Sequence, residues 1–157
     1  MKITNAGTAG SSYEGDDEHL AKYAFENTES KYWKGSSTNP QYIWFRFHTP
    51  RVLAGIEITP YRNAFGPELF QVVGSNDCWS WRTMLGVADS GFPNDLQPGV
   101  SKYWDIPRAN RLSFYCIGLK IFTIPFGRNR SPELKNIVMW EDAELKEKNL
   151  LQSVWKW

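Results

Sequence analysis

The side chains that most often carry out acid–base, nucleophilic or metal chemistry are scarce in this sequence. It has two histidines, His19 and His48, and its clustered acids, Asp16–Glu18 and Glu141–Asp142, are consecutive. Consecutive carboxylates favour solvated faces, not a general acid and base that face each other across a pocket. There is no Gly-x-Ser-x-Gly elbow, phosphate loop, His-Glu-x-x-His or Cys-x-x-Cys. We therefore predict that the chain is not an enzyme.

Cys78 and Cys116 are the only cysteines in the chain. One pair in a mid-sized domain is weak evidence for a disulfide or for an oxidising compartment. The two residues could form one bridge, but we favour the interpretation that they are buried thiols or bystanders.

Aromatic residues make up 15% of the chain, whereas the net charge is only +1. A near-neutral balance lacks the basic field that nucleic-acid binding needs, so we expect no nucleic-acid partner. No apolar run approaches the length of a membrane helix. Phe65 and Phe92 fall in loops suited to lipid contact, but so small a charge gives little electrostatic help, and we do not expect membrane insertion.

Period-two alternation dominates the middle of the chain and predicts short strands. In Tyr42–His48, the apolar residues Ile43, Phe45 and Phe47 share one face, and Thr49-Pro50 ends the run. The other predicted strands are Val52–Thr59, Leu69–Gly74, Trp81–Val87, Lys102–Ile106, Arg111–Phe122 and Asn136–Trp140. Short helices are predicted over Asp17–Phe25 and Glu141–Leu151. Many short strands separated by turns favour an all-β, antiparallel sandwich or barrel.

Several segments, in order, resemble discoidin domains, the coagulation factor 5/8 type C family, and the related family 32 carbohydrate-binding modules. The run Ala24–Trp33 is similar to the opening of that family, Pro40–Phe47 to its first long strand, and Pro67–Asp77 to its most recognisable segment. The resemblance covers about Ala21 to Glu141. It implies a galactose-binding-like jelly-roll β-sandwich over residues 1–141, followed by a short C-terminal helical tail at 142–157.

The resemblance also implies a sugar site in the loops at one end of the sandwich. Arg62 stands where family members place an arginine that grips sugar hydroxyls, and Asn129, with Arg128 before it, stands in the loop that often assists. Lys34 takes the place of a histidine found in many sugar binders. The stacking ring is expected from Trp33, Phe65 or Phe126. Because a loop arginine rarely supports a core, we expect Arg62 to be dispensable for folding.

Family members often hold a structural calcium ion beside the opening motif. Here the aligned positions are Glu26 and Asn136, and the family's Asp-Gly-Asn-Thr run has become Glu26-Asn27-Thr28-Glu29. Calcium needs several oxygen ligands in a tight loop, and Glu26 and Glu29 alone supply few. We predict no metal site and no cofactor, with calcium as the alternative.

The resemblance implies a non-catalytic module that binds a glycan or glycoprotein surface. The alternative is a structural subunit of a virion or phage tail that uses the jelly roll for protein contacts. No signal peptide is visible after Met1, and we expect an extracellular or virion-surface location. The tail carries an apolar stripe at helical spacing, formed by Leu150, Leu151, Val154, Trp155 and Trp157. This stripe predicts either a contact in a homo-oligomer or larger assembly, or packing of the tail onto its own sandwich.

Overall fold

The computed structural model of the protein describes all residues except 4–5, 14–15, 29, 125–129 and 149–157. Strands dominate it, as the alternation predicts. The elements are β1 (Gly7–Ser11), α1 (Lys22–Glu26), β2 (Trp33–Lys34), β3 (Gln41–Pro60), the 3-10 turn η1 (Asn63–Phe65), β4 (Leu69–Ser75), β5 (Arg82–Asp89), β6 (Lys102–Asp105), the 3-10 turn η2 (Arg108–Asn110), β7 (Ser113–Thr123) and β8 (Glu133–Glu141). Residues 143–148 are helical. In the part of the chain that the structure describes, no helix is long and apolar enough to cross a membrane.

The strand β3 belongs to both sheets of the sandwich. Its first half pairs with β1 and β7 in the β7 sheet, ordered β1-β3-β7-β4-β5. Its second half pairs with β8 and β6 in the β8 sheet, which β2 completes at the edge of β8. All of these pairings are antiparallel, so the predicted antiparallel jelly-roll sandwich is confirmed.

The two strands predicted at Tyr42–His48 and Val52–Thr59 are one continuous strand with an irregular middle. Pairing with β7 shifts register between Arg46 and Arg51. Pro50 lies in this interval, where its missing N–H removes no regular ladder bond. The irregularity lets one strand leave the β7 sheet and enter the β8 sheet.

Alternation along β3 supplies the centre of the core. Ile43, Phe45 and Phe47 point inward from the β7 sheet, and Ile56 and Ile58 point inward from the β8 sheet, all buried. The other strands and α1 add residues to the same cluster: Ala24, Phe25, Phe70, Val72, Ile117, Leu119, Ile121, Leu134, Ile137 and Met139. The buried faces of the two sheets therefore hold the sandwich together.

The predicted helix over Asp17–Phe25 is shorter in the structure. A carboxylate oxygen of Asp16 accepts the Glu18 N–H at 2.9 Å and lies 2.7 Å from His19 Nδ1, which favours a turn in this segment. The helix α1 begins only at Lys22 and ends where Asn27 adopts a left-handed conformation with φ 51°. The sequence pattern also missed two short strands, β1 and β2.

Buried ion pairs join β3 to β8 at both ends of their pairing. At one end, Arg62, just after β3, bonds to Glu133 at the start of β8. At the other end, Arg51 Nη1 lies 3.5 Å from a carboxylate oxygen of Glu141, the last residue of β8. Both glutamate side chains are 2% exposed. Each glutamate therefore needs its cation, since an unpaired buried carboxylate is costly.

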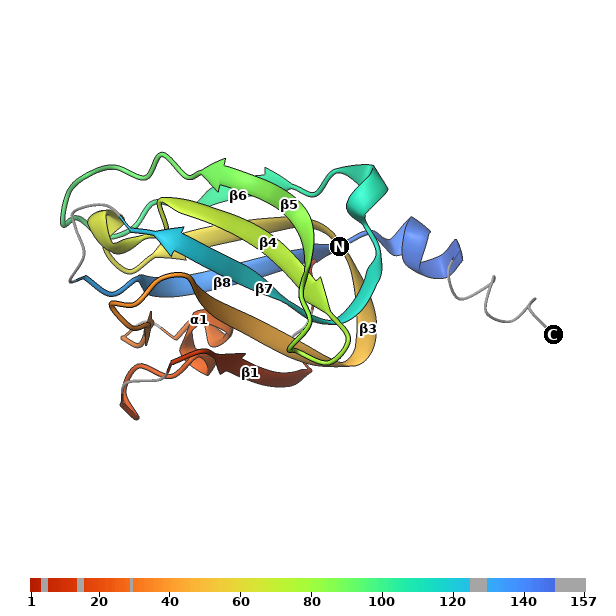
Figure 1. Cartoon of the computed structure of the whole chain (residues 1–157), viewed down its shortest axis with the longest axis horizontal. Helices are drawn as coiled ribbons and strands as arrows, with labels where there is room; N and C mark the ends of the chain where they lie inside the picture. The colour runs from red at the N-terminus through yellow and green to blue at the C-terminus, as the bar shows by residue number, and fades with distance from the viewer. Residues whose placement is uncertain (4–5, 14–15, 29, 125–129, 149–157) are drawn as a thin grey trace.

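The two ends of the sandwich carry different elements. Figure 1 shows η1, in yellow, at one end, and the helical residues 143–148, in blue, at the other. We call the first the η1 end. At the opposite end, the Asp142 carboxylate accepts the Leu145 N–H at 3.0 Å and a hydrogen bond from Arg111 Nη1 at 3.0 Å, and these contacts lower the pKa of its carboxyl. The tail residues from 149 onward lie outside the described residues, and the domain boundary at 141 stays a prediction.

Cys78 and Cys116 form a disulfide, so the favoured interpretation as separate thiols was wrong. Register explains the pairing: β4 places Ser75 opposite Cys116, and the turn after β4 brings Cys78 back over this position. The two Cα atoms are 5.5 Å apart. Sequence spacing alone carries no information about this register.

We predict that the bridge stabilises the domain. It joins residues separated by 38 positions, and closing a loop of that length removes enough unfolded-state entropy to contribute about 3–4 kcal/mol. The double variant Cys78→Ser/Cys116→Ser should lose that amount in urea unfolding. Reductant should destabilise the wild-type protein but not the variant. Identical urea midpoints for the variant and the oxidised wild type would show that the bridge contributes nothing.

Candidate functional site

Arg62 and Glu133 form a fixed, two-pronged ion pair at the η1 end. Arg62 Nε and Nη2 donate to the two carboxylate oxygens of Glu133, both at 3.0 Å. The Arg62 side chain is 37% exposed, whereas that of Glu133 is 2% exposed. The pKa of the Arg62 guanidinium is raised, chiefly because Glu133 accepts its hydrogen bonds. The guanidinium therefore stays charged and is held in one orientation at the surface.

The ion pair with Glu133 uses only some of the N–H donors of Arg62. A guanidinium has five N–H groups, and Glu133 accepts from two of them. The remaining N–H groups suit adjacent oxygen acceptors on a ligand, because their fork geometry is rigid. This contact also argues against the expectation that Arg62 is dispensable for folding.

Phe65 lies against two guanidinium groups. The centre of its ring is 4.2 Å from Arg62 Cζ and 5.2 Å from Arg130 Cζ, distances at which a cation is attracted to an aromatic face. The ring is half-buried. The turn η1 brings Phe65 next to Arg62, since the Phe65 N–H donates to the Arg62 carbonyl at 3.0 Å.

A row of three rings, Tyr61, Tyr32 and His19, begins at the residue before Arg62. Tyr61 and Tyr32 are stacked, with ring centres 3.9 Å apart and planes 10° apart. His19 packs on Tyr32 at 4.6 Å, and its Nδ1 contacts Asp16. The pKa of the Tyr32 hydroxyl is raised, first by burial and then by the negative charge of Glu133. Tyr32 is therefore neutral at physiological pH, and its hydroxyl can donate or accept a hydrogen bond.

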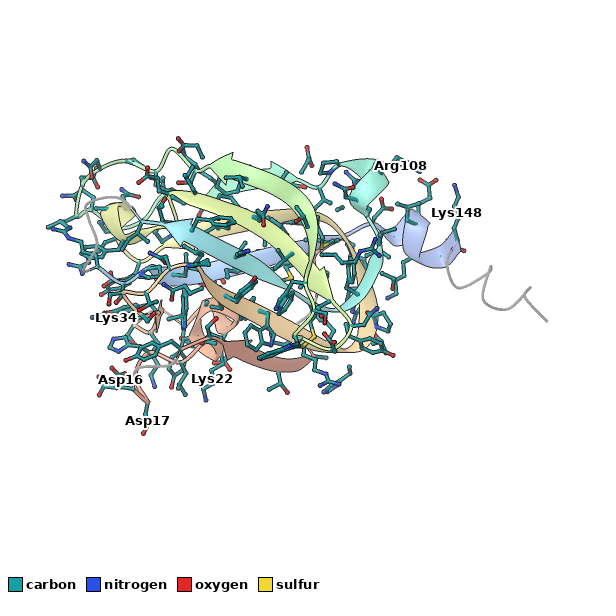
Figure 2. All side chains as sticks on the ribbon, viewed as in Figure 1. Asp16, Asp17, Lys22, Lys34, Arg108 and Lys148 are labelled. Carbon is teal, nitrogen blue, oxygen red and sulfur yellow. A yellow bond between two sulfur atoms is a disulfide. The ribbon has the colours of Figure 1, made fainter. Side chains whose placement is uncertain are left out.

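Two hollows border this row. The larger, about 680 Å³, is lined by polar side chains that include Asp16, His19, Lys34 and Gln41. The smaller, about 340 Å³, is lined by Tyr61, Arg62, Leu96, Pro98, Gly99 and Lys135. In Figure 2, Lys34 and Asp16 lie at the end away from Arg108 and Lys148. The η1 end thus combines rings, charged donors and concave surface, the features of a site for a small polar ligand.

The structure brings together only some of the residues predicted for the site. Arg62 and Phe65 are in contact, and exposed Lys34 pairs with Glu133 in the β2–β8 ladder. Trp33 was wrongly predicted as a stacking ring: it is fully buried in the core, because successive residues of a strand face opposite sides and Lys34 takes the outer one. The predicted residues Phe126, Arg128 and Asn129 lie outside the described residues.

Sequence reasoning missed several residues of this site. Tyr32 and Tyr61 directly precede Trp33 and Arg62, which sequence reasoning did select. Their position next to predicted site residues could therefore have pointed to them. Glu133 had no such signal, because its role depends on the pairing of β8 with β3.

The structure places the two positions that align with the family's calcium ligands on different elements. Glu26 is exposed at the end of α1, and Asn136 lies within β8 opposite Thr59. Among the described residues, no group of three or more His, Cys, Asp or Glu side chains gathers closely enough to hold a metal ion. Glu29, the other candidate ligand, lies outside them.

Comparison with solved structures identifies the fold. An F5/8 type C domain from Bacteroides fragilis matches with a TM-score of 0.71 at 12% identity, covering 89% of this chain and 95% of that one. A family 32 carbohydrate-binding module from Clostridium perfringens, in complex with GalNAc-β-1,3-galactose, matches with a TM-score of 0.66 at 15% identity, covering 85% and 94%. The chain has the fold of these domains. No family model and no curated protein matches the sequence.

Further matches point to the same fold. Chitosan-binding module 1, from a chitosanase/glucanase of Paenibacillus sp. IK-5, matches with a TM-score of 0.63 at 14% identity, covering 85% of this chain and 94% of that one. The discoidin-like fold expected from the sequence is therefore confirmed. The alternative of a virion or phage-tail subunit gains no support from these comparisons.

We predict that Arg62→Ala destabilises the domain. The substitution leaves the buried Glu133 carboxylate without its hydrogen-bond donors, which costs about 2–3 kcal/mol of unfolding free energy. Urea denaturation at pH 7 measures this loss. The double variant Arg62→Ala/Glu133→Gln should recover part of it, because the amide carries no charge. If Arg62→Ala unfolds at the wild-type midpoint, the ion pair does not support the fold.

Proposed function

We propose that the protein is a non-catalytic module that binds glycans at the η1 end. The observation that carries this proposal is the Arg62–Glu133 pair, which holds a charged fork at the surface beside the half-buried ring of Phe65 and a hollow of about 340 Å³. Its partner is a glycan or a glycoprotein surface.

A sugar needs both parts of this arrangement. Its hydroxyls accept hydrogen bonds from the free N–H groups of Arg62, whereas its weakly polar ring face packs on an aromatic side chain. Phe65 supplies such a ring, and Lys135 in the same hollow and Lys34 nearby add further donors. Within the described residues, no hydrogen-bonded pair of nucleophile and base accompanies these groups, so they suit binding better than turnover.

Structural neighbours support the ligand class. One family 32 module was solved in complex with 4,5-unsaturated mannuronic acid, another with GalNAc-β-1,3-galactose, and a third neighbour is described as pectin-binding. These three neighbours bind different sugars on one fold, so the ligand class, a glycan, is what they have in common.

The Cys78–Cys116 disulfide supports action outside the reducing cytoplasm. Such bridges form and persist in oxidising environments and are rare in cytosolic proteins. We propose an extracellular location for the module. Assembly through the tail stays a prediction about residues outside those described.

The substitution Arg62→Lys tests the proposed site without leaving Glu133 unpaired, because lysine keeps the charge and loses only the rigid fork. We expect wild-type protein to bind at least one neutral glycan on an array, with an affinity on the order of millimolar to micromolar. In NMR titrations with that glycan, Arg62→Lys should weaken binding at least about tenfold.

The matched control is Arg108→Lys, an exposed arginine on η2 at the opposite end, whose side chain is 60% exposed. This variant should bind like the wild type. The proposal fails if no glycan binds, or if Arg62→Lys and Arg108→Lys bind equally well.

A further inference from the structure

The outward face of the β7 sheet carries rings and cations at positions that the register defines. Because alternate residues face the core, the intervening ones face outward. Three rows run across β3, β7 and β4 and continue to β1 or to Ser12, the residue after it: Ser12, Tyr42, Lys120 and Gln71; Gly10, Trp44, Gly118 and Val73; Thr8, Arg46, Cys116 and Ser75. The first two rows supply two aromatic rings, and Lys120 and Arg46 supply positive charge.

Trp44 lies between two glycines, and this flat stretch of the face depends on them. A Cβ atom at Gly10 would meet carbons of the Trp44 ring at 2.7 Å, and one at Gly118 would overlap the Ile43 carbonyl oxygen and meet Trp44 Cα at 2.6 Å. Real Cβ atoms do not approach so closely, so both positions need a residue without a side chain. Next to Gly118, Val73 and Cys116 are buried although they face outward.

A third ring covers this stretch because the disulfide holds it there. The turn between β4 and β5 is fastened to the outward Cys116 through Cys78, and it delivers Trp81 to the same face. Trp81 lies 5.5 Å from Tyr42, with ring planes 18° apart, and 5.6 Å from Trp44. All three rings are half-buried, so part of each is open to solvent.

Trp79 lies on the turn that the disulfide fastens to this face. Its side chain is 86% exposed, although it sits between two residues that are anchored to the face, Cys78 and Trp81. The Asp77 carboxylate accepts the N–H groups of Trp79 at 2.9 Å and Ser80 at 2.7 Å, which fixes the turn. An exposed tryptophan on a fixed, cross-linked turn loses little entropy when a ligand covers it.

The strand positions of this face carry only positive charge, whereas the exposed carboxylate of Asp77 lies on the adjoining turn. None of the twelve outward positions in the three rows is acidic, and Arg46 and Lys120 form no ion pair with a carboxylate among the described residues. The Nζ atom of Lys120 lies 5.7 Å from the centre of the Tyr42 ring and 5.0 Å from that of Phe122, so the rings keep this cation beside them. We call Tyr42, Trp44, Trp79 and Trp81, with Arg46 and Lys120, the aromatic face.

We propose that the aromatic face is a second binding surface, for a polysaccharide whose sugars carry carboxylate or sulfate groups. Successive sugar rings pack on the aromatic side chains, and the anionic groups pair with Lys120 and Arg46. A neutral chain would leave both cations without an added partner. The face shares no residue with the Arg62 site, so this surface does not depend on the glycan site at the η1 end.

The test uses three soluble probes: oligogalacturonate, which carries carboxylates, sulfated dextran, which carries sulfates, and neutral dextran. Binding to the full chain is measured by calorimetry in low salt, and the melting temperature of every variant is recorded. Trp79→Ala removes a side chain that is 86% exposed, so the fold cannot depend on it. Arg46→Glu/Lys120→Glu reverses the charge of the face.

Wild-type protein should bind oligogalacturonate, sulfated dextran or both more tightly than neutral dextran, and binding should weaken as salt is added. Trp79→Ala should weaken it about tenfold, the equivalent of about 1.4 kcal/mol, and the charge reversal should abolish it. Arg62→Lys and the control Arg108→Glu, an exposed cation elsewhere, should leave it unchanged.

Four results would overturn the proposal. One is the absence of anionic binding by the wild type, and another is equal binding of neutral dextran. The third is equal loss in Arg108→Glu, which would reveal only a general attraction between charges. The last is loss of binding in Arg62→Lys with retention in Trp79→Ala, which would place the anionic chain at the η1 end.

Discussion

The strand β3 is the constraint on which the rest of this structure depends. Its first half supplies inward Ile43, Phe45 and Phe47 to one sheet, and its second half supplies Ile56 and Ile58 to the other. Since the same strand is hydrogen-bonded in both sheets, neither sheet can shift without moving the other. Both surfaces of interest begin from β3: Arg62 lies two residues beyond its last residue, Pro60, and Tyr42 and Trp44 face outward near its start.

The two surfaces use aromatic rings in different ways. At the η1 end, the Phe65 ring is paired with Arg62, and Tyr32 is stacked on Tyr61, so rings and polar groups alternate around concave surface. Such a site suits a ligand end that enters a hollow. On the β7 sheet, Trp44 and Trp81 lie on a strand surface flattened by glycine, which suits a ligand that lies along it.

Alternation was enough to predict an antiparallel all-β sandwich or barrel, because burial of one strand face sets a pattern within each segment. The resemblance to discoidin domains then favoured the jelly-roll sandwich. The family resemblance, not the alternation, selected Arg62 and Phe65, which lie close together in the sequence. It missed Glu133 and the Cys78–Cys116 bridge, because those contacts depend on which strands are neighbours and in what register. The prediction that Trp33 contacts a ligand was wrong for a more local reason. Successive residues of β2 face opposite sides, so Trp33 lies in the core and its neighbour Lys34 lies at the surface.

The buried pairs Arg62–Glu133 and Arg51–Glu141 bracket the ladder between β3 and β8. A slip of β8 by one residue would separate both pairs at once and would turn Ile137 and Met139 outward, so the ion pairs and the core packing would be lost together. The two ion pairs therefore favour the native register of β8 against β3. Any other register loses the ion pairs as well as the core packing. Correct register matters for the ligand surfaces as well. Their rings and cations come from separate strands, so the register of those strands sets their positions.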